Sequence, residues 1–188
     1  SLFAMPARSP KNRVVMDSRS IDLAVRRVAR AIESRTDDAG RVVLVGIQTG
    51  GVWLARHLAR HLARLWGAPV PVGQLDISMH RDDLDQRLAP EVYPTAIGFD
   101  VTGKTVILVD DVLFSGRTIR AAMDALTDLG RPRRIQLAVL IDRGHRELPI
   151  EADFVGKRIP TTAADRVDVR LADTLAASQV ILEKAARR

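Results

Sequence analysis

Three short apolar runs, separated by segments with helical periodicity, constrain the fold of this chain more than any other feature. The runs are RVVLVG (41–46), TVILVDD (105–111) and RIQLAVLID (134–142). Continuous apolar runs of this length are typical of strands that are buried on both faces of a sheet. When such strands alternate with helices, they form a parallel sheet connected by right-handed crossovers. The sequence therefore predicts the α/β class, with a parallel sheet and helices on both of its faces.

The predicted helices are three segments in which apolar residues recur every three to four positions. They cover residues 18–35, 52–66 and 117–129, and Asp17 or Ser18 is the expected N-cap of the first. A glycine follows each of the last two segments, as at many helix C-termini. Each predicted helix is followed in the sequence by a predicted strand, as the α/β class requires.

The rest of the chain has weaker patterns. VGQLDIS (72–78) predicts a further strand, and RVDVRLAD with SQVILEK near the C-terminus predicts a hairpin. Residues 79–104 contain charges, two prolines and no regular period, which predicts a long flexible flap. Residues 143–188 are expected to form a small hood, which includes a short strand and turn at ADFVGKRIPT. We expect residues 17–188 to form one domain, preceded by residues 1–16 as an N-terminal arm or a cloning remnant.

Composition excludes several classes of protein. A chain of 188 residues with 46% hydrophobic and 28% charged residues is neither collagen-like nor wholly disordered. It has no cysteine, which excludes disulfides, thiolate zinc sites, iron–sulfur clusters and cysteine nucleophiles. No apolar run approaches the ~20 residues that cross a bilayer, and the start lacks the apolar core of a secretory signal. We therefore expect a cytoplasmic protein without a membrane partner.

The net charge of +6 favours ligands that carry phosphate, either a small substrate or a nucleic acid. A merely solvated arginine surface explains the same charge equally well. Four Phe, two Trp and one Tyr are too few for a base-stacking strip, so any RNA binding would depend on arginines. His57 and His61 have the spacing of metal ligands on a helix, but no third ligand is in view, which favours ordinary surface histidines.

The segment VDDVLFSGRT (109–118) carries the clearest chemical pattern. Asp110 and Asp111 follow the apolar run, and the turn from Phe114 to Thr118 opens a helix whose backbone N–H groups can hold an anion. Carboxylates accept hydrogen bonds from vicinal hydroxyls and hold hydrated magnesium. Taken separately, the acids could cap the helix or pair with Arg117, and the turn could be a plain connection. Together they predict a site for ribose 5-phosphate; neither a Walker nor a Rossmann glycine motif is present.

These residues carry a resemblance to a known family. VILVDDVLFSGRT (106–118) resembles the phosphoribosyl pyrophosphate (PRPP) motif of type I phosphoribosyltransferases. With RDDL (81–84) and DRGHRELP (142–149), the chain is similar to the PyrR family over about residues 41–161. Members of that family are pyrimidine operon regulators that are also uracil phosphoribosyltransferases. The resemblance implies the type I phosphoribosyltransferase fold, with a parallel sheet, helices on both faces and a small hood.

The resemblance also implies an activity and partners. The enzyme would convert uracil and PRPP to UMP and pyrophosphate, with Mg²⁺ held through PRPP and no metal ligands from the protein. UMP-dependent binding to the leader mRNA of the pyrimidine operon would attenuate transcription. A homodimer or a larger homo-oligomer is expected. Two alternatives remain open, an RNA-binding regulator with vestigial transferase activity and a phosphoribosyltransferase for a purine base.

The resemblance assigns two groups of residues to PRPP. Asp110 and Asp111 would be catalytic, with Asp111 the better candidate for handling a proton. The residues that bind PRPP would be Asp110, Asp111, Val112, Leu113, Phe114, Ser115, Gly116, Arg117 and Thr118. The residues at its pyrophosphate would be Thr49, Gly50, Gly51 and Arg81. A tight strand-to-helix turn is the alternative explanation for the glycines, and a charged hairpin tip is the alternative for the flap.

Base and RNA contacts follow from the same resemblance. The residues at the base would be Arg143, Phe154, Val155 and Lys157, although Phe154 could equally be a core residue. The basic residues at RNA would be Arg26, Arg27, Arg30, His145, Arg146 and Arg158. The chain departs from the family pattern at Gly50, where arginine is common, at His80, where tyrosine is usual, and at Ser115, where threonine is frequent. Gly50 matters most because a cation is lost there, for which Arg81 could compensate.

Overall fold

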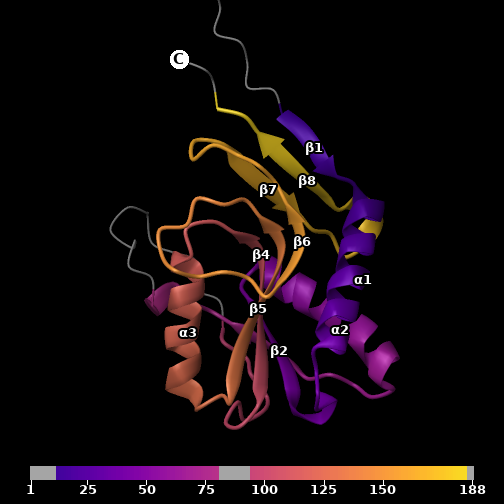
Figure 1. Cartoon of the computed structure of the whole chain (residues 1–188), viewed down its shortest axis with the longest axis vertical. Helices are drawn as coiled ribbons and strands as arrows, with labels where there is room; N and C mark the ends of the chain where they lie inside the picture. The colour runs from indigo at the N-terminus through magenta and orange to yellow at the C-terminus, as the bar shows by residue number, and fades with distance from the viewer. Residues whose placement is uncertain (1–11, 81–93, 186–188) are drawn as a thin grey trace, which may run out of the picture.

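The computed structural model describes residues 12–80 and 94–185. Its main sheet has five parallel strands in the order β3-β2-β4-β5-β6 (Figure 1). The strands are β2 (Val42–Ile47), β3 (Val72–Leu75), β4 (Thr105–Leu113), β5 (Arg134–Asp142) and β6 (Phe154–Arg158). The parallel sheet predicted from the apolar runs is confirmed, and β5 has the predicted bounds. β4 extends two residues past the predicted run, because Val112 and Leu113 still pair with β5.

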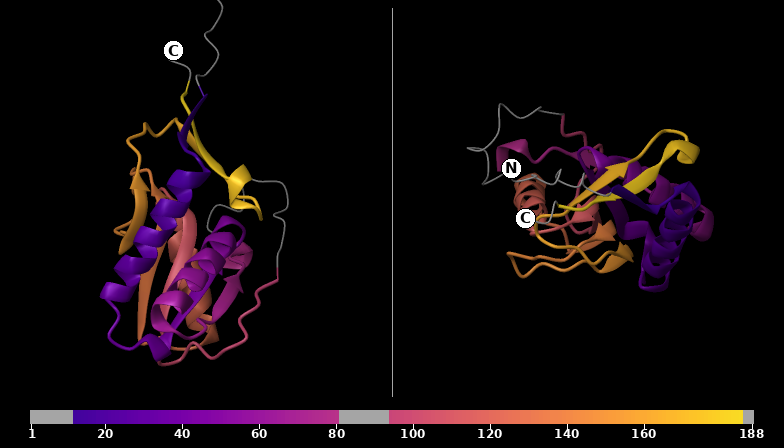
Figure 2. Two further views of the ribbon diagram at one scale, coloured as in Figure 1. Left: turned by 90° about the vertical axis from the view of Figure 1, so that its right-hand side faces the viewer. Right: turned by 90° about the horizontal axis from the view of Figure 1, so that it is seen from above.

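Three helices cover the two faces of this sheet. Helices α1 (Ser18–Ser34) and α2 (Gly50–Trp66) lie together on one face, and α3 (Arg117–Leu129) lies on the other (Figures 1 and 2). Asp17 caps α1, and its carboxylate accepts a hydrogen bond of 2.8 Å from Ser20 N. The predicted apolar stripe of α1, from Ile21 to Ile32, is buried against the sheet. The described part of the chain has no helix that is both long and apolar enough to cross a membrane.

A second sheet forms the hood. It contains β1 (Asn12–Met16), β8 (Gln179–Glu183) and β7 (Arg166–Arg170), in that order and antiparallel throughout. The predicted C-terminal hairpin is therefore confirmed as β7 and β8. Short 3₁₀ turns lie at Ala39–Arg41, Ser78–His80 and Leu175–Ala177.

Two expected boundaries differ from the structure. Residues 12–16 are not part of a free arm, because they form β1 and pair with β8, with Asn12 opposite Glu183. The hood expected over 143–188 does not contain 154–158, which form β6 at the edge of the main sheet and pair with 138–142 of β5. The hood is thus built from both ends of the described chain, a pairing between residues too distant in sequence for local patterns to reveal.

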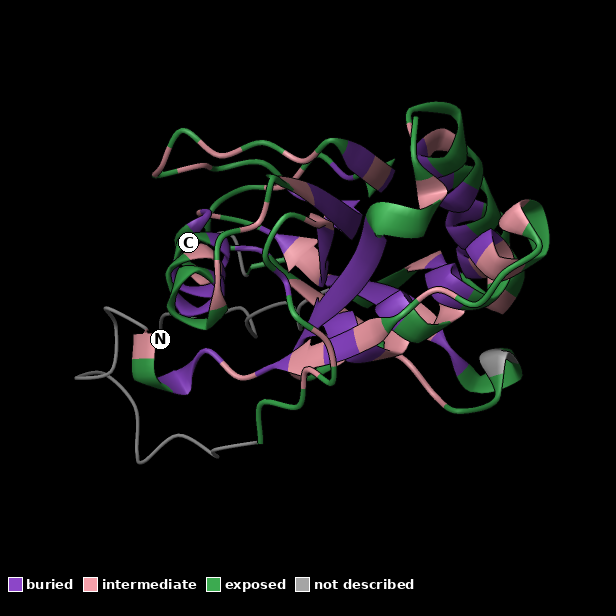
Figure 3. Cartoon of the chain, turned by 90° about the horizontal axis from the view of Figure 1, so that it is seen from below, coloured by how far each residue is buried: buried purple, intermediate pink, exposed green. Residues whose placement is uncertain are grey.

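Buried side chains are concentrated along the strands of the main sheet and on the inner faces of the helices (Figure 3). Leu44, Ile107, Leu108 and Leu140 are at most 1% exposed. Met16 and Val180 of the hood belong to the same apolar cluster as α1 and α2, so the hood is packed onto that side of the molecule. The main sheet is consequently a rigid base whose carboxyl edge carries the loops described next.

Candidate functional site

The two acids of β4 lie where the neighbouring strand on one side has ended. β4 pairs with β2 only as far as Val109, opposite Gly46, whereas it pairs with β5 through Leu113. Asp110 and Asp111 therefore border the loop that leads from β2 into α2. Asp110 is 7% exposed, and its carboxylate accepts the backbone N–H of Asp111 at 2.9 Å. The carboxylate of Asp111 accepts the N–H of Val112 at 2.8 Å.

The glycines at the start of α2 pack directly against these acids. A Cβ atom on Gly51 would overlap the carbonyl oxygen of Val109, and one on Gly50 would lie 2.6 Å from Cγ of Asp111. The carboxyl group of Asp111 thus occupies space that a side chain at position 50 would need. α2 begins at Gly50 rather than at the predicted residue 52. The peptide bond between Gln48 and Thr49 is cis.

Burial in this position raises the pKa of the Asp111 carboxyl group, and hydrogen bonds from Asp110 and the backbone offset this only in part. The enclosed, low-dielectric surroundings disfavour the charged form. Asp111 is therefore a stronger proton acceptor than an exposed carboxylate. Carboxylate oxygens beside a loop of backbone donors also fit a hydrated magnesium ion that arrives with a phosphate ligand.

The turn before α3 has the shape of an anion site. Gly116 adopts a φ of 93° in the left-handed region, which glycine reaches without strain, and α3 starts at the next residue. The hydroxyl of Ser115 accepts the N–H of Arg117 at 3.3 Å. The structure thus brings Ser115, Gly116 and Thr118 to the helix N-terminus, where backbone N–H groups and the helix dipole favour a phosphate.

The loop that follows β5 supports this turn through hydrogen bonds. The carbonyl oxygen of Ser115 accepts N–H groups from Glu147 at 2.9 Å and from Leu148 at 3.2 Å. The carboxylate of Glu147 also binds Nε of Arg117 at 2.7 Å. The segment DRGHRELP (142–149), which contributed to the family resemblance, therefore holds the phosphate turn in place.

Arg146 makes several of the contacts that hold this loop and the phosphate turn together. Its guanidinium binds the carboxylate of Asp142 at 2.8 Å and donates to the carbonyl oxygens of Phe114 at 3.0 Å and Ile150 at 2.8 Å. Its side chain is only 20% exposed. The resemblance places Arg146 among the RNA contacts, whereas its contacts in the structure support the phosphate turn. A local pattern could not reveal the contact with Phe114, which lies 32 residues away along the chain.

Arg143 reaches the same edge of the sheet. It is 7% exposed, and its guanidinium carbon lies 4.1 Å from the centre of the Phe114 ring. Nη2 donates to the carbonyl oxygen of Thr162 at 3.0 Å, whereas Nε is buried without a partner among the described residues. Burial lowers the pKa of this guanidinium. A buried donor without a partner among the described residues therefore lies next to the phosphate turn.

The other expected base contacts are placed differently. Phe154 is 3% exposed in the core at the start of β6, far along the strand from the carboxyl edge, so it is a core residue and not a base contact. Val155 packs on the α3 side of the sheet. Lys157 lies near the carboxyl end of β6, where its ammonium donates to the carbonyl oxygen of Val15 at 3.1 Å. The core alternative for Phe154 is the one that the structure supports.

The pyrophosphate candidates are only partly described. Arg81 lies outside the described residues, as does half of the flap expected over 79–104. Thr49 and Gln48 line a cavity of about 350 Å³ that Arg56 and Arg60 of α2 also line. The sequence analysis did not single out these two arginines. Their position on α2, about two turns after the glycine loop, is the signal that could have indicated them.

The basic candidates lie on two segments. On α1, Arg26 pairs with Asp22 at 2.8 Å, Arg27 donates to the carbonyl oxygen of Gly156, and Arg30 is exposed. Near the hood, Arg158 is 74% exposed, and His145 bonds to the carbonyl oxygen of Thr161 at 2.7 Å.

His57 and His61 are half-buried. His57 stacks on Trp53 with ring centres 3.6 Å apart, and His61 lies 4.0 Å from the Asp22 carboxylate. Burial lowers the pKa of both imidazoles. Among the described residues, no three side chains of the usual ligand types form a group able to hold a metal ion.

Comparison with known proteins identifies the family. The family model of the phosphoribosyl transferase domain matches residues 17–174. Bifunctional protein PyrR of Chloroflexus aurantiacus is 55% identical over 169 residues, 89% of this chain and 93% of that protein. The chain belongs to the PyrR family of phosphoribosyltransferases. A second PyrR, from Listeria monocytogenes, is 51% identical over 92% of this chain and 96% of its own length.

Solved structures agree with the fold of the PyrR chain. A hypoxanthine phosphoribosyltransferase from Trypanosoma cruzi has a TM-score of 0.69 at 18% identity, covering 96% of this chain and 95% of its own. A hypoxanthine-guanine phosphoribosyltransferase from Bacillus anthracis has a TM-score of 0.62 at 21% identity, covering 79% and 84%. At these identities the likeness establishes the shared type I phosphoribosyltransferase fold alone.

Proposed function

We propose that this chain transfers the phosphoribosyl group of PRPP to uracil, forming UMP and pyrophosphate, and regulates the pyrimidine operon by binding leader mRNA. The observation that carries the transferase function is the acid pair of β4 beside the phosphate turn, at one edge of a parallel sheet. Membership of the PyrR family supports both functions, and the distribution of arginines on α1 supports the second.

The reaction exchanges one bond at C1 of the ribose for another. The bond from C1 to the pyrophosphate oxygen breaks, the bond from C1 to a uracil nitrogen forms, and that nitrogen loses its proton. Asp110 and Asp111 accept hydrogen bonds from the ribose hydroxyls, which holds C1 in line between uracil and pyrophosphate. Asp111, whose pKa burial raises, takes up the proton. The turn from Phe114 to Thr118 holds the 5-phosphate.

The pyrophosphate leaves with several negative charges, so its stabilisation is the largest electrostatic task of the site. Thr49, Gly50 and Gly51 present backbone donors to it. Arg56 and Arg60, which line the cavity beside Thr49, supply positive charge that Gly50 lacks, together with Arg81. Mg²⁺, when bound, would neutralise part of the pyrophosphate charge, and the oxygens of Asp110 and Asp111 would be its nearest protein partners.

The base lies against Phe114 and Arg143 in this proposal. The buried Nε of Arg143 has no protein partner among the described residues, and a carbonyl oxygen of uracil would satisfy it. A purine base is not favoured, because the solved purine enzymes share at most 21% identity with this chain whereas the PyrR relatives share 51–55%.

A substrate panel tests the transferase function. Purified protein is incubated with PRPP, Mg²⁺ and, separately, uracil, hypoxanthine, guanine and adenine, and nucleotide formation is measured. We expect UMP from uracil and at least about a hundredfold less product from each purine. Product from a purine alone would contradict the assignment.

The role of Asp111 is tested in the same assay. Asp111→Asn should lower kcat for UMP formation by at least about a hundredfold, because the neutral amide accepts no proton. Asp124→Asn, an exposed change on α3, is the matched control and should leave kcat unchanged. Unreduced turnover in Asp111→Asn would remove the proton-accepting role from this residue.

The regulatory function is tested by titrating pyrimidine-operon leader RNA into the protein, with and without UMP. We expect UMP to tighten binding, because nucleotide at the carboxyl edge orders the segments next to Arg158 and the end of β6. Binding that is indifferent to UMP for every RNA tried would contradict UMP-dependent regulation. We further propose that the protein acts in the cytoplasm. We also propose that it forms a homodimer or a larger assembly, and light scattering on the purified chain would test this oligomeric state.

A further inference from the structure

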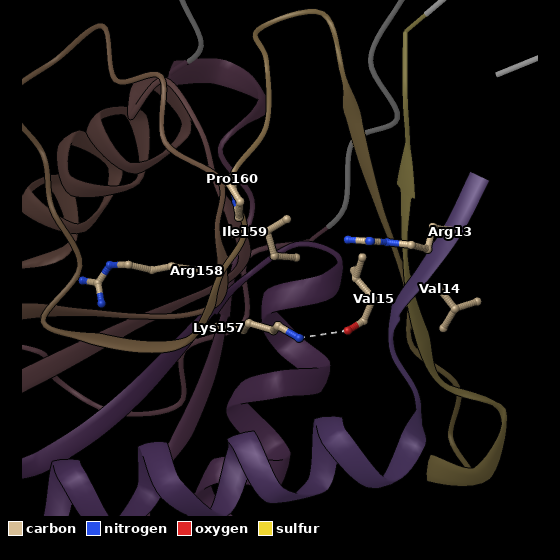
Figure 4. Close-up of a pocket in the computed structure, with 7 residues that line it drawn as sticks. All are labelled: Arg13, Val14, Val15, Lys157, Arg158, Ile159 and Pro160. Atoms are coloured by element: carbon tan, nitrogen blue, oxygen red, sulfur yellow. Dashed lines mark hydrogen bonds between the residues drawn. The ribbon is translucent and has the colours of Figure 1, made fainter. Parts of the chain in front are cut away.

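A groove of about 310 Å³ lies between the hood and the end of β6 in the main sheet (Figure 4). One wall is β1, the edge strand of the hood, and the other is the end of β6 with the residues that follow it. In Figure 4 the side chains of Arg13 and Lys157 extend into this space from opposite walls. Val14 and Arg158 point away from it on their respective sides.

The charge of the groove is entirely positive. None of its seven lining residues is acidic, and neither Arg13 nor Lys157 forms an ion pair with a described residue. Arg13 is exposed and offers the five donors of a guanidinium. The ammonium of Lys157 uses one donor on the carbonyl oxygen of Val15, at 3.1 Å, and retains others. Two unpaired cations facing one small space favour an anionic group between them.

The walls between the two cations are apolar. Val15 projects from β1, and Ile159 and Pro160 project from the segment after β6 (Figure 4). The volume is at the lower end of that found for small-ligand sites, roughly 300–1,000 Å³. A ligand that fits has a compact flat or apolar body and carries a phosphate. A single nucleotide has both properties.

The basic face of α1 lies close to the β6 wall of the groove. Arg27 donates to the carbonyl oxygen of Gly156, the residue before Lys157. The phosphates of a polynucleotide could therefore pass from α1 to Lys157 and Arg13. We propose that this groove binds one unpaired nucleotide of single-stranded RNA, with its phosphate between Arg13 and Lys157 and its sugar or base on Val15 and Ile159. This inference rests on the proposed RNA-binding function and adds Arg13, a residue that the sequence did not indicate.

An acidic peptide is the competing occupant, since one edge of β1 pairs with no strand in the described part of the chain. Addition of a peptide strand would need the backbone groups along that edge. The carbonyl oxygen of Val15 is already taken by Lys157, which interrupts the row of acceptors. The contacts therefore favour a ligand held by side-chain donors.

The decisive variants change Arg13, which lies outside the proposed catalytic machinery. Binding of a fluorescein-labelled, 12-nucleotide single-stranded RNA of mixed sequence is measured by anisotropy from 50 to 300 mM KCl. Arg13→Ala should weaken binding about tenfold at low salt and reduce the log–log salt slope by about 0.7, because one phosphate contact is lost. Arg13→Glu should weaken it further. Arg131→Ala, an exposed arginine in the turn between α3 and β5 at the opposite end of the sheet, removes the same charge and should change neither quantity.

A second variant separates the shape of the groove from its charge. Val15→Phe leaves every charge in place but fills the space between the walls, so it should weaken RNA binding about as much as Arg13→Ala. Thermal unfolding confirms that each variant is folded, and UMP formation should be unchanged in all of them.

The outcomes distinguish this inference from the function on which it rests. If the unchanged protein binds the RNA but Arg13→Ala, Arg13→Glu and Val15→Phe all behave like Arg131→Ala, the groove is not a nucleotide site, while RNA binding stands. If the unchanged protein fails to bind this RNA even at 50 mM KCl, the inference is overturned, whereas the proposed regulatory function is decided separately by the titration with leader RNA. If hexaglutamate binds with a dependence on Arg13 that RNA lacks, the groove takes an acidic peptide and the inference is overturned.

Discussion

At the scale of single residues, Gly50 and Asp111 share one space. The carboxyl group of Asp111 lies where a side chain at position 50 would begin, and the enclosure that results raises its pKa. The departure from the family pattern at Gly50 removes a cation. It also leaves room for the carboxyl group of Asp111. The two residues should be considered as a pair in any account of PRPP binding.

The first prediction concerns Gly50. Gly50→Ala places a Cβ atom 2.6 Å from Cγ of Asp111, so the carboxyl group must move away from the ribose. We expect kcat/KM for PRPP to fall by about tenfold or more, since misplacement of a positioning group by 1 Å is costly. The control is Gly40→Ala, whose Cβ would meet its nearest neighbour at an ordinary 3.4 Å. Equal kinetics for the two variants would show that Asp111 is not held by this contact.

The second prediction concerns the pH dependence that Asp111 causes. Its carboxyl pKa is raised above 3.8 in the folded state, so the folded protein keeps this proton at a pH where the unfolded chain has lost it. Stability consequently falls as pH rises from about 4 through the folded pKa. Asp111→Asn removes the effect and should raise the unfolding temperature at pH 7, with no gain below pH 3.8. A gain that is the same at pH 3 and pH 7 would contradict the raised pKa.

At the scale of structural elements, the loop after β5 and the turn before α3 act as one unit. Arg146, Glu147 and Leu148 all bond to backbone or side-chain atoms of residues 114–117. The phosphate turn is thereby held in the ligand-free molecule, which lowers the cost of ordering it when PRPP binds.

The third prediction tests that unit. Arg146→Ala removes one ion pair and three hydrogen bonds from a side chain that is 20% exposed. We expect a loss of about 2 kcal/mol in the free energy of unfolding and a higher KM for PRPP. Urea unfolding and steady-state kinetics measure the two effects. Arg133→Ala, at the opposite end of β5, should change neither, and an unaltered KM in Arg146→Ala would show that the turn is stable without these contacts.

At the scale of the whole molecule, the hood joins the two ends of the described chain. Asp165 is 3% exposed and ties this unit together, because its carboxylate accepts Thr162 N at 2.7 Å, Lys184 Nζ at 2.9 Å and Ala185 N at 3.0 Å. These donors hold the pKa of Asp165 well below its usual range. The ionised form is the one that stabilises the hood.

The fourth prediction follows from the sign of that shift. A depressed carboxyl pKa contributes stability above the unfolded value of 3.8, and this contribution is lost as pH falls below it. Asp165→Asn should therefore be less stable than the unchanged protein at pH 7, and the difference should shrink between pH 4 and pH 2. Thermal unfolding across this range measures it. The trend is opposite to that of Asp111→Asn, so the two variants are controls for each other.

The sequence by itself determined the elements whose signals are local. The apolar runs and helical periods indicated β2, β4, β5, the three helices and the C-terminal hairpin, and the acids with the glycine turn indicated the phosphate site. Each of these signals arises within a stretch of neighbouring residues, where backbone geometry and side-chain periodicity act directly.

Only the tertiary structure decided how distant segments meet. It placed β1 beside β8, β6 in the main sheet, Phe154 in the core and Arg146 under the phosphate turn. It also set Arg13 opposite Lys157 across a groove. The physical reason is that each of these contacts joins residues far apart along the chain, and its stability depends on the packing of the elements between them, which no local pattern encodes.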